Sequence, residues 1–172
     1  MNCDENREKS LSKAKNDAYS YLSHRMRTVY EVRCKLKEKD YECNIVNAVI
    51  NELIDLKYLD DYEYALRYYE YNRNKKRGVK RAEHALKQRG VDSEIIENAK
   101  EDFEYETEKS DLVVASEIAQ KVLSQYKIED ITCECRIDER IIAKIARKLD
   151  NAGFSISDIS KVLANIRCSI NC

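Results

Sequence analysis

Three stretches, TVYEVRCKL (residues 28–36), GVKRAEHAL (residues 78–86) and IIAKIARKL (residues 141–149), share one apolar register. A shift of 50 residues aligns the first with the second, and a further shift of 63 aligns both with the third. The apolar positions that coincide are Val29, Val32 and Leu36, then Val79, Ala82 and Leu86, then Ile142, Ile145 and Leu149. This spacing marks one face of a helix, so the sequence predicts a helical unit that occurs three times.

Two more helices complete each of the three predicted repeats. One precedes the shared stretch, with apolar positions within residues 11–22, 64–71 and 112–123. The other follows it, with apolar positions at Tyr41, Val46, Val49 and Leu53, at Val91, Ile96, Ala99 and Phe103, and at Phe154, Ile159, Val162 and Ile166. The turn before this last helix carries Asp40, Gly90 or Gly153, residue types that suit the left-handed conformation ending a helix.

Helix start signals agree with this register. Thr28 and Glu31 have the spacing of a capping box, in which each residue caps the other's backbone. Asp60, at the start of the acidic DDYE segment, and also Asp92 and Ser155 stand where side-chain caps are expected. Pattern and caps therefore predict the same helices.

The sequence predicts an all-α fold of three tandem three-helix repeats forming an elongated, curved array. With no proline, no tryptophan and three glycines, little interrupts helices. A repeat of about 50 residues buries little surface alone, so neighbours must stack. The expected segments are a polar N-terminal stretch (1–10), repeat 1 (11–59), repeat 2 (60–106) and repeat 3 (107–172), with an insertion near 127–137 interpreted as a loop or short extra turn.

Charge is segregated along the chain although the formal net charge is only −1. Residues 73–89 carry eight Lys or Arg and one Glu, whereas residues 92–111 carry nine acids and two Lys. The basic run is either a solvated helix face or a patch for phosphates or an acidic protein surface. Because the pair Arg25 and Arg27 aligns with Lys75 and Arg77, the basic junction itself recurs. The candidate binding residues are Arg25, Arg27, Arg73, Lys75, Lys76, Arg77, Lys80, Arg81 and Arg89.

Tyrosines crowd the stretch YLDDYEYALRYYEY (residues 58–71). Tyr64, Tyr68 and Tyr71 share a helical face, which predicts that they are core residues. Tyr62 and Tyr69, seven residues apart, could instead form an exposed stripe that stacks on a base or a partner.

Catalysis is not indicated, so we expect a protein that is not an enzyme. The three glycines, at 78, 90 and 153, are too far apart for a phosphate-binding loop, and neither histidine lies in a metalloprotease motif. Asp60 and Asp61 are better explained as caps than as an acid and a base. We expect no cofactor and no metal, although a zinc site from Cys133, Cys135, Cys168 and Cys172 is conceivable.

The seven cysteines are expected to be reduced thiols, because their number is odd and no export signal is seen. No apolar run approaches the roughly 18 residues of a membrane-spanning helix. The sequence therefore predicts a cytoplasmic protein with no membrane contact.

The residues resemble the RecX family over about residues 14–103. Residues 14–36 follow the pattern A-x-x-x-A-x-x-x-L-x-x-R-x-R-T-x-x-E-V-x-x-K-L, and the family's Y-L-D-D motif is similar to Tyr58, Leu59, Asp60 and Asp61 with Tyr64 and Ala65 after it. Gly78, Arg81 and the segment Arg89-Gly90-Val91 resemble the next family motifs. Lys57 and Asp40 stand where the family usually has glycine, and Ala85 replaces a frequent glutamate.

The resemblance implies three tandem three-helix repeats that bind within the groove of the RecA recombinase filament on single-stranded DNA. It further implies restraint of ATP hydrolysis and strand exchange in DNA repair and the SOS response, by a chain expected to be a monomer with at most weak direct DNA contact. Two alternatives stay open: a helix-turn-helix-like DNA-binding protein and a general helical-repeat scaffold.

Overall fold

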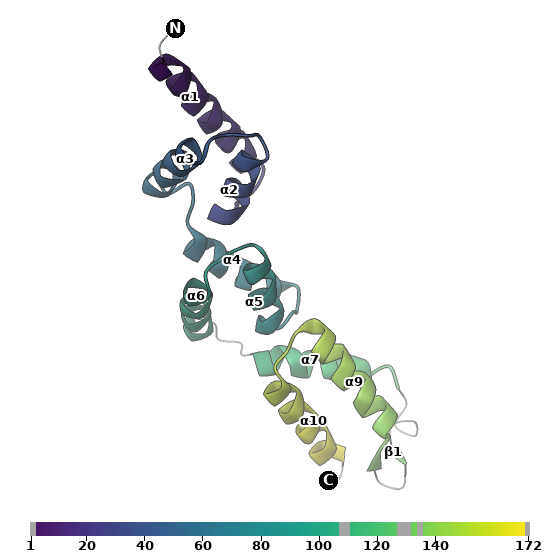
Figure 1. Ribbon diagram of the computed structural model, residues 1–172. Helices are drawn as coiled ribbons and strands as arrows, with labels where there is room; N and C mark the ends of the chain where they lie inside the picture. The colour runs from purple at the N-terminus through teal and green to yellow at the C-terminus, as the bar shows by residue number, and fades with distance from the viewer. Residues whose placement is uncertain (1–2, 107–110, 127–131, 134–135, 171–172) are drawn as a thin grey trace. The chain divides into compact units, whose positions relative to one another are not determined.

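The computed structural model describes residues 3–106, 111–126, 132–133 and 136–170 (Figure 1). These residues form nine helices and one pair of two-residue strands, which confirms the all-α expectation. The elements are α1 (Cys3–Leu22), α2 (Val29–Lys37), α3 (Cys43–Asp55), α4 (Asp61–Asn74), α5 (Val79–Gln88), α6 (Ser93–Glu106), α7 (Asp111–Leu123), β1 (Thr132–Cys133), β2 (Arg136–Ile137), α9 (Glu139–Ala152) and α10 (Ile156–Ile170). None of the described helices is both long and apolar enough to span a membrane.

The chain divides into two compact units. Unit 1 contains the chain up to Arg67 together with Leu86–Ala99, and unit 2 contains Tyr68–Ala85 together with the chain from Lys100 onward. The division runs through α4, α5 and α6. Each unit therefore combines one complete three-helix group with part of the helices between the two groups.

In unit 1, α1, α2 and α3 pack against one another. Their buried side chains are those that the register predicts, together with neighbours on the same faces, and Leu59 after α3 joins this core: Ala14, Ala18, Val32, Leu36, Ile45, Val46, Val49, Ile50, Leu53 and Leu59. The predicted capping box is confirmed. Thr28 Oγ1 accepts a hydrogen bond from Glu31 N at 3.1 Å, and Glu31 Oε2 accepts one from Thr28 N at 3.1 Å. This box starts α2 at Val29.

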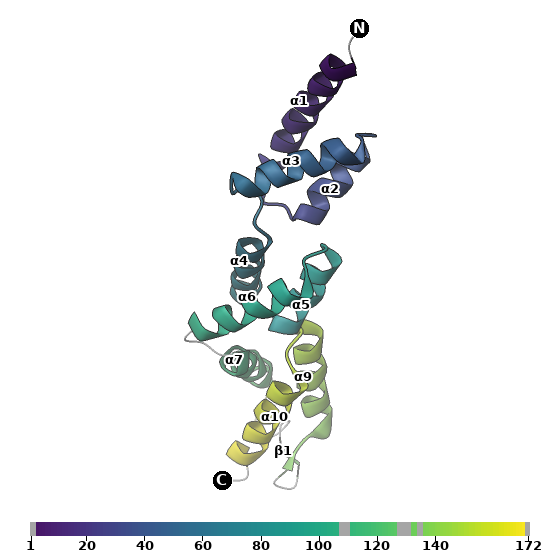
Figure 2. The same ribbon diagram turned by 60° about the vertical axis from the view of Figure 1, so that its left-hand side comes forward.

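In unit 2, α7, α9 and α10 form a second three-helix group, which both views show together (Figures 1 and 2). Its core contains Val114, Ala115, Ala119, Val122, Ile141, Ile142, Ile145, Leu149, Phe154, Ile159, Val162 and Ile166. Asp138 caps α9 by accepting from Arg140 N at 2.8 Å. Within the expected insertion, β1 and β2 pair in antiparallel fashion, so its described part is a small hairpin rather than a plain loop or a helical turn.

The predicted turn residues adopt the expected conformation. Asp40, Gly90 and Gly153 have φ angles of 59°, 72° and 88°. Lys57, which stands where the resemblance expects a glycine, also has a positive φ of 59°. Two departures from the family pattern, at Asp40 and Lys57, thus keep a left-handed backbone that glycine adopts more easily.

The structure corrects the tyrosine assignment. Tyr69, one half of the possible exposed stripe, is only 1% exposed and stacks on Phe103 with ring centroids 5.4 Å apart, so that stripe does not form. Tyr71, expected in the core, is 50% exposed. The buried residues of α4 include Tyr64, Ala65 and Tyr69, at positions i, i+1 and i+5. The core face of this helix is therefore rotated away from the i, i+4 and i+7 face that the sequence predicted.

We call the contacts at the start of α2 the first joint. Asp61, the first residue of α4, accepts a hydrogen bond from Val29 N at 2.9 Å through Oδ1. Thr28 Oγ1 donates to the carbonyl oxygen of Arg89 at 2.7 Å. Asp60, by contrast, caps its own helix by accepting from Tyr62 N and Glu63 N. The two adjacent carboxylates therefore have separate capping roles, as their different directions at a helix start predict.

The second joint, at the start of α5, repeats this arrangement 50 residues later. Asp111 Oδ2 accepts from Val79 N at 2.9 Å, which matches the bond from Val29 to Asp61. Gly78 N donates to the carbonyl oxygen of Ala152 at 3.0 Å. The backbones are so close that a Cβ added at Gly78 would lie 2.2 Å from the carbonyl oxygen of Gly153. Glycine at position 78 is therefore a steric requirement.

Candidate partner-binding surface

The basic residues of the first joint are bound within unit 1. Arg25 Nη2 donates to Glu31 Oε1 at 2.8 Å, and Arg27 Nη1 lies 3.8 Å from the same oxygen. The Arg27 guanidinium also sits 4.0 Å from the centroid of the Tyr21 ring, and its side chain is only 14% exposed. Arg27 thus has a structural role, and Glu31 is the shared partner of both arginines.

Arg89 also contributes to the first joint. Its side chain is half-buried, and its carbonyl oxygen receives the hydrogen bond from Thr28. Burial raises the pKa of Tyr64, while the positive charges of Arg89 and Arg25 oppose that rise. Arg25 and Arg89 therefore interact electrostatically with a buried tyrosine of α4.

Arg73 is also a structural residue, in unit 2. Its side chain is 12% exposed, with Nη2 3.3 Å from Asp111 Oδ1 and the guanidinium 4.7 Å from the centroid of Phe103. Burial raises the pKa of Asp111, whereas the Val79 N–H and the charge of Arg73 oppose that rise. Arg73 thereby partners the carboxylate that caps α5.

The remaining candidates form what we call the second basic junction: Lys75, Lys76, Arg77, Lys80 and Arg81. Lys75, Lys76, Lys80 and Arg81 are exposed, and Arg77 is half-buried. Lys76 pairs with Glu117 at 2.8 Å, but both side chains are solvent-accessible, so this ion pair is weak. Five cations therefore cluster here. Lys76 has Glu117 as a partner, and Lys80 lines a pocket with the acids Glu83, Glu104, Asp111 and Asp158.

The two joints differ in charge at one aligned position. The shift of 50 residues that aligns Arg25 with Lys75 and Arg27 with Arg77 aligns Glu31 with Arg81. The acid that pairs with both arginines of the first joint is thus replaced by another cation in the second. Among the described residues, Lys75, Arg77, Lys80 and Arg81 form no ion pair, whereas Lys76 pairs with Glu117.

Arg81 connects this junction to α9. Its Nη1 donates to the carbonyl oxygen of Asn151 at 2.9 Å, and a Cβ added at Gly153 would lie 2.5 Å from Arg81 Cβ. Asn151 lines an open groove along α9 with a volume of about 950 Å³. The second basic junction and this groove therefore adjoin within unit 2.

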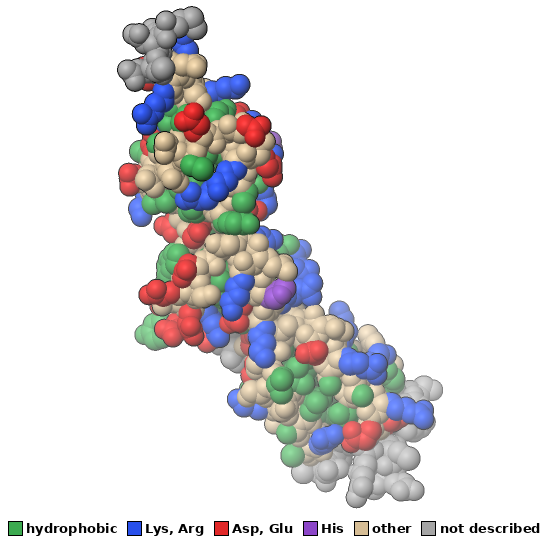
Figure 3. Space-filling model, viewed as in Figure 1, with side chains coloured by type: hydrophobic (Ala, Val, Ile, Leu, Met, Phe, Trp, Pro, Cys, Tyr) green, Lys and Arg blue, Asp and Glu red, His purple; other side chains and the backbone are tan. Residues whose placement is uncertain are grey.

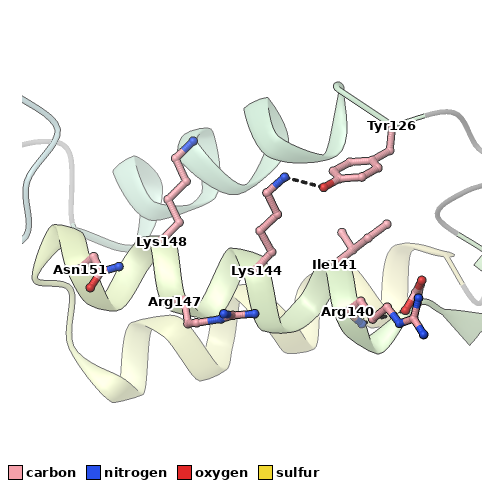
Figure 4. A pocket seen from close by; sticks show the side chains of 8 residues that line it. Tyr126, Arg140, Ile141, Lys144, Arg147, Lys148 and Asn151 are labelled. Atoms are coloured by element: carbon pink, nitrogen blue, oxygen red, sulfur yellow. Dashed lines mark hydrogen bonds between the residues drawn. The ribbon is translucent and has the colours of Figure 1, made fainter.

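The groove presents four exposed cations that sequence reasoning missed: Arg140, Lys144, Arg147 and Lys148. Figure 4 shows them along α9, with Lys144 donating to the Tyr126 hydroxyl at 2.7 Å. In Figure 3, Lys and Arg side chains gather on the side of unit 2 that α9 forms. Their spacings of four, seven and eight residues from Arg140 are a weaker signal in the sequence than the denser basic run at 73–89.

Several residues of the segment that resembles the Y-L-D-D family motif, residues 58–65, lie in the interior of unit 1. Leu59, Tyr64 and Ala65 are buried, at 1%, 6% and 0% exposure. Tyr58 is 60% exposed and touches the Tyr19 ring edge to face, with ring centroids 5.4 Å apart. Gly90 lies against the ring of Tyr30.

The described residues contain no cluster of His, Cys, Asp and Glu arranged to hold a metal ion. The side chains of Cys133, Cys135 and Cys172, three members of the conceivable zinc site, lie outside the described residues, and Cys168 is a free, exposed thiol. His24 is exposed, with Nδ1 2.9 Å from the carbonyl oxygen of Ser20, and His84 is exposed as well. Both positions fit ordinary surface histidines.

Two family models match this chain: the RecX first three-helix domain over residues 14–53 and the RecX second three-helix domain over residues 60–99. A regulatory protein RecX from Leuconostoc mesenteroides is 31% identical over 157 residues, which cover 91% of this chain and 55% of that protein. One from Streptococcus pneumoniae is 35% identical over 152 residues, covering 86% and 53%. The chain thus spans about half the length of these curated relatives.

Solved structures agree with the sequence matches. The crystal structure of RecX from Lactobacillus salivarius superposes with a TM-score of 0.76 at 28% identity, covering 92% of this chain and 97% of that one. A crystal structure of regulatory protein RecX gives a TM-score of 0.70 at 26% identity, covering 89% and 71%. Together with the joints and their motif residues, these matches show that the chain belongs to the RecX family of regulatory proteins.

Proposed function

We propose that this protein regulates the RecA recombinase by binding the RecA filament on single-stranded DNA, without catalysing a reaction. The observation that carries this proposal is the second basic junction, a cationic cluster with no balancing acid at the position of Arg81, in a chain of the RecX family. A filament of RecA on DNA offers both phosphate and carboxylate groups to such a cluster.

The mechanism follows from the repeat architecture. Successive three-helix repeats, stacked as the predicted elongated and curved array, occupy a long groove rather than a small pocket. A chain that spans neighbouring RecA subunits would hold their spacing fixed and exclude other DNA from the groove. Filament growth, ATP hydrolysis and strand exchange would all slow as a consequence.

The test is single-stranded-DNA-dependent ATP hydrolysis by the cognate RecA, measured with and without this protein. Wild type should lower the rate. A variant with Lys76, Arg77, Lys80 and Arg81 changed to alanine should need on the order of ten-fold more protein for the same effect and show a shallower salt dependence. The matched control changes four other exposed lysines to alanine: Lys13, Lys37, Lys121 and Lys161.

Three outcomes would contradict the proposal or the role it gives to the second basic junction. An unchanged ATPase rate together with tight, sequence-selective binding to duplex DNA would favour a helix-turn-helix-like DNA-binding protein. An unchanged rate together with binding to some other protein would favour a scaffold. Equal loss of effect in the cluster variant and its control would show that overall charge, rather than the second basic junction, drives binding.

A further inference from the structure

The groove along α9 is a second basic feature, distinct in its residues from the second basic junction. Arg140, Lys144, Arg147 and Lys148 are exposed, while Ile141 on the groove floor is only 5% exposed. Among the described residues, no carboxylate forms an ion pair with any of these four cations. The one acid that lines the groove, Asp138, accepts the Arg140 backbone N–H as the cap of α9.

We infer that this groove binds the phosphate backbone of single-stranded nucleic acid without reading its sequence. Arg140, Lys144 and Lys148 follow one another at intervals of about one helical turn, Arg147 precedes Lys148, and Arg140 and Asn151 are about 17 Å apart along the axis. A series of cations at such intervals can contact successive anions of a phosphate chain.

The lining favours nucleic acid over an acidic protein. Protein interfaces are centred on apolar or aromatic anchors in desolvated pockets, and the aliphatic residue of this lining, Ile141, is already buried. Interfaces with nucleic acid are more polar and far more positive, as this groove is. The partner's contacts are therefore mainly ionic.

The groove also carries groups that suit unpaired bases. The Tyr126 ring lies next to Lys144, whose Nζ is 5.1 Å from the ring centroid and 2.7 Å from the hydroxyl (Figure 4). An aromatic face and the planar guanidinium groups of Arg140 and Arg147 can stack on bases that are free of a duplex. Since every base has a flat face, such stacking is not selective for sequence.

The second basic junction extends this track. Arg81 reaches the carbonyl oxygen of Asn151, which lies at the groove end opposite Arg140. A strand held in the groove would pass toward Arg81 and Lys80 within the same unit. The site does not depend on the proposed action on RecA, because it requires this chain and a strand alone.

The experiment measures fluorescence anisotropy of a labelled oligothymidylate with the full chain, over a series of salt concentrations and without RecA. Lys144→Ala combined with Lys148→Ala should weaken binding on the order of ten-fold and reduce the slope of log affinity against log salt by about 1.4. Lys144→Arg with Lys148→Arg should keep wild-type affinity, because charge is retained. Lys121→Ala with Lys161→Ala, which removes two exposed lysines of the same unit outside the groove, should also bind normally.

Several results would overturn the inference. Failure of wild type to bind at low salt would do so, and so would an alanine variant of Lys144 and Lys148 that keeps both affinity and slope. Tighter binding of a duplex than of a single strand, or of polyglutamate than of the oligonucleotide, would assign the groove to a different partner. Circular dichroism of each variant checks that the helices are retained, and the two arginine replacements separate loss of charge from loss of fold.

Discussion

At the first joint, Glu31 closes a capping box and neutralises Arg25, whereas at the second joint Arg81 stands in that place and no capping box can form. The hydroxyl of Thr28 bridges the first joint, but at the second the bare backbone of Gly78 does so. One geometry is thus achieved by side chains in unit 1 and by close backbone contact in unit 2. The difference separates a joint whose arginines share an internal acid from one where, among the described residues, Lys75, Arg77, Lys80 and Arg81 form no ion pair.

Gly78→Ala should be the most damaging change. Its Cβ would lie 2.2 Å from a backbone oxygen and 2.5 Å from the carbonyl carbon of Gly153, which cannot move aside as a flexible side chain can. We expect the free energy of unfolding to fall by about 3 kcal/mol, the upper part of the range for overpacking. Urea denaturation followed by circular dichroism measures it, with the exposed helix change Ser160→Ala as control. A loss below that of the control would mean the second joint is not closely packed.

Asp111→Ala should cost more than Asp61→Ala. Each loses one cap of a backbone N–H, worth about 1 kcal/mol. Only Asp111 also partners a cation, Arg73, which is 12% exposed and would be left without that partner. We expect a further loss of about 1–2 kcal/mol at Asp111. Equal losses in urea denaturation would show that the Arg73 ion pair contributes nothing.

Arg81→Glu converts the second joint to the charge pattern of the first. The new carboxylate can pair with Lys75 or Arg77, so we expect binding to RecA filaments to weaken by about ten-fold with a shallower salt dependence. Arg81→Gln, which removes charge without adding an acid, should lie between this variant and wild type. The filament affinities of wild type, Arg81→Glu and Arg81→Gln are measured at two salt concentrations. Equal affinities would contradict the proposed difference between the two joints.

The smallest expected effect is a pH dependence at the first joint. Burial raises the pKa of Asp61, and the charges of Asp60 and Glu31 add to that rise, while the Val29 N–H opposes it. The folded state therefore binds this proton more tightly than the unfolded state. Its stabilising contribution is full below the unfolded pKa and is lost as pH rises through the folded pKa.

Asp61→Asn removes this titration but keeps an oxygen that can accept from Val29 N. The difference in unfolding free energy, wild type minus Asp61→Asn, should fall as pH rises from acid toward neutral. Urea denaturation of both proteins across that range measures the difference directly. A difference that rises with pH would show that the Asp61 carboxylate is stabilised, not penalised, by its surroundings.

The register and local signals predicted most of the fold. The capping box at Thr28, the left-handed turns at Asp40, Gly90 and Gly153, and nearly all of the buried positions follow from residue type and spacing. These features depend on neighbours within a few residues along the chain. For that reason they could be read from the sequence.

What the sequence did not predict depends on contacts between distant residues. Asp61 caps a helix that starts 32 residues earlier, and nothing in its local pattern distinguishes it from Asp60. Arg27 and Arg73 looked like members of binding clusters, yet each lies over an aromatic ring and is mostly buried. Charge density alone cannot separate a cation with an internal partner from one that faces solvent.

The central claim is that the second basic junction binds the partner whereas the arginines of the first joint hold unit 1 together. The most direct test measures filament affinity and unfolding free energy for two variants: Arg25→Ala with Arg27→Ala, and Lys80→Ala with Arg81→Ala. We expect the first variant to lose stability and the second to lose affinity while remaining as stable as wild type. The opposite result, with affinity lost on changing Arg25 and Arg27 and retained on changing Lys80 and Arg81, would contradict the account.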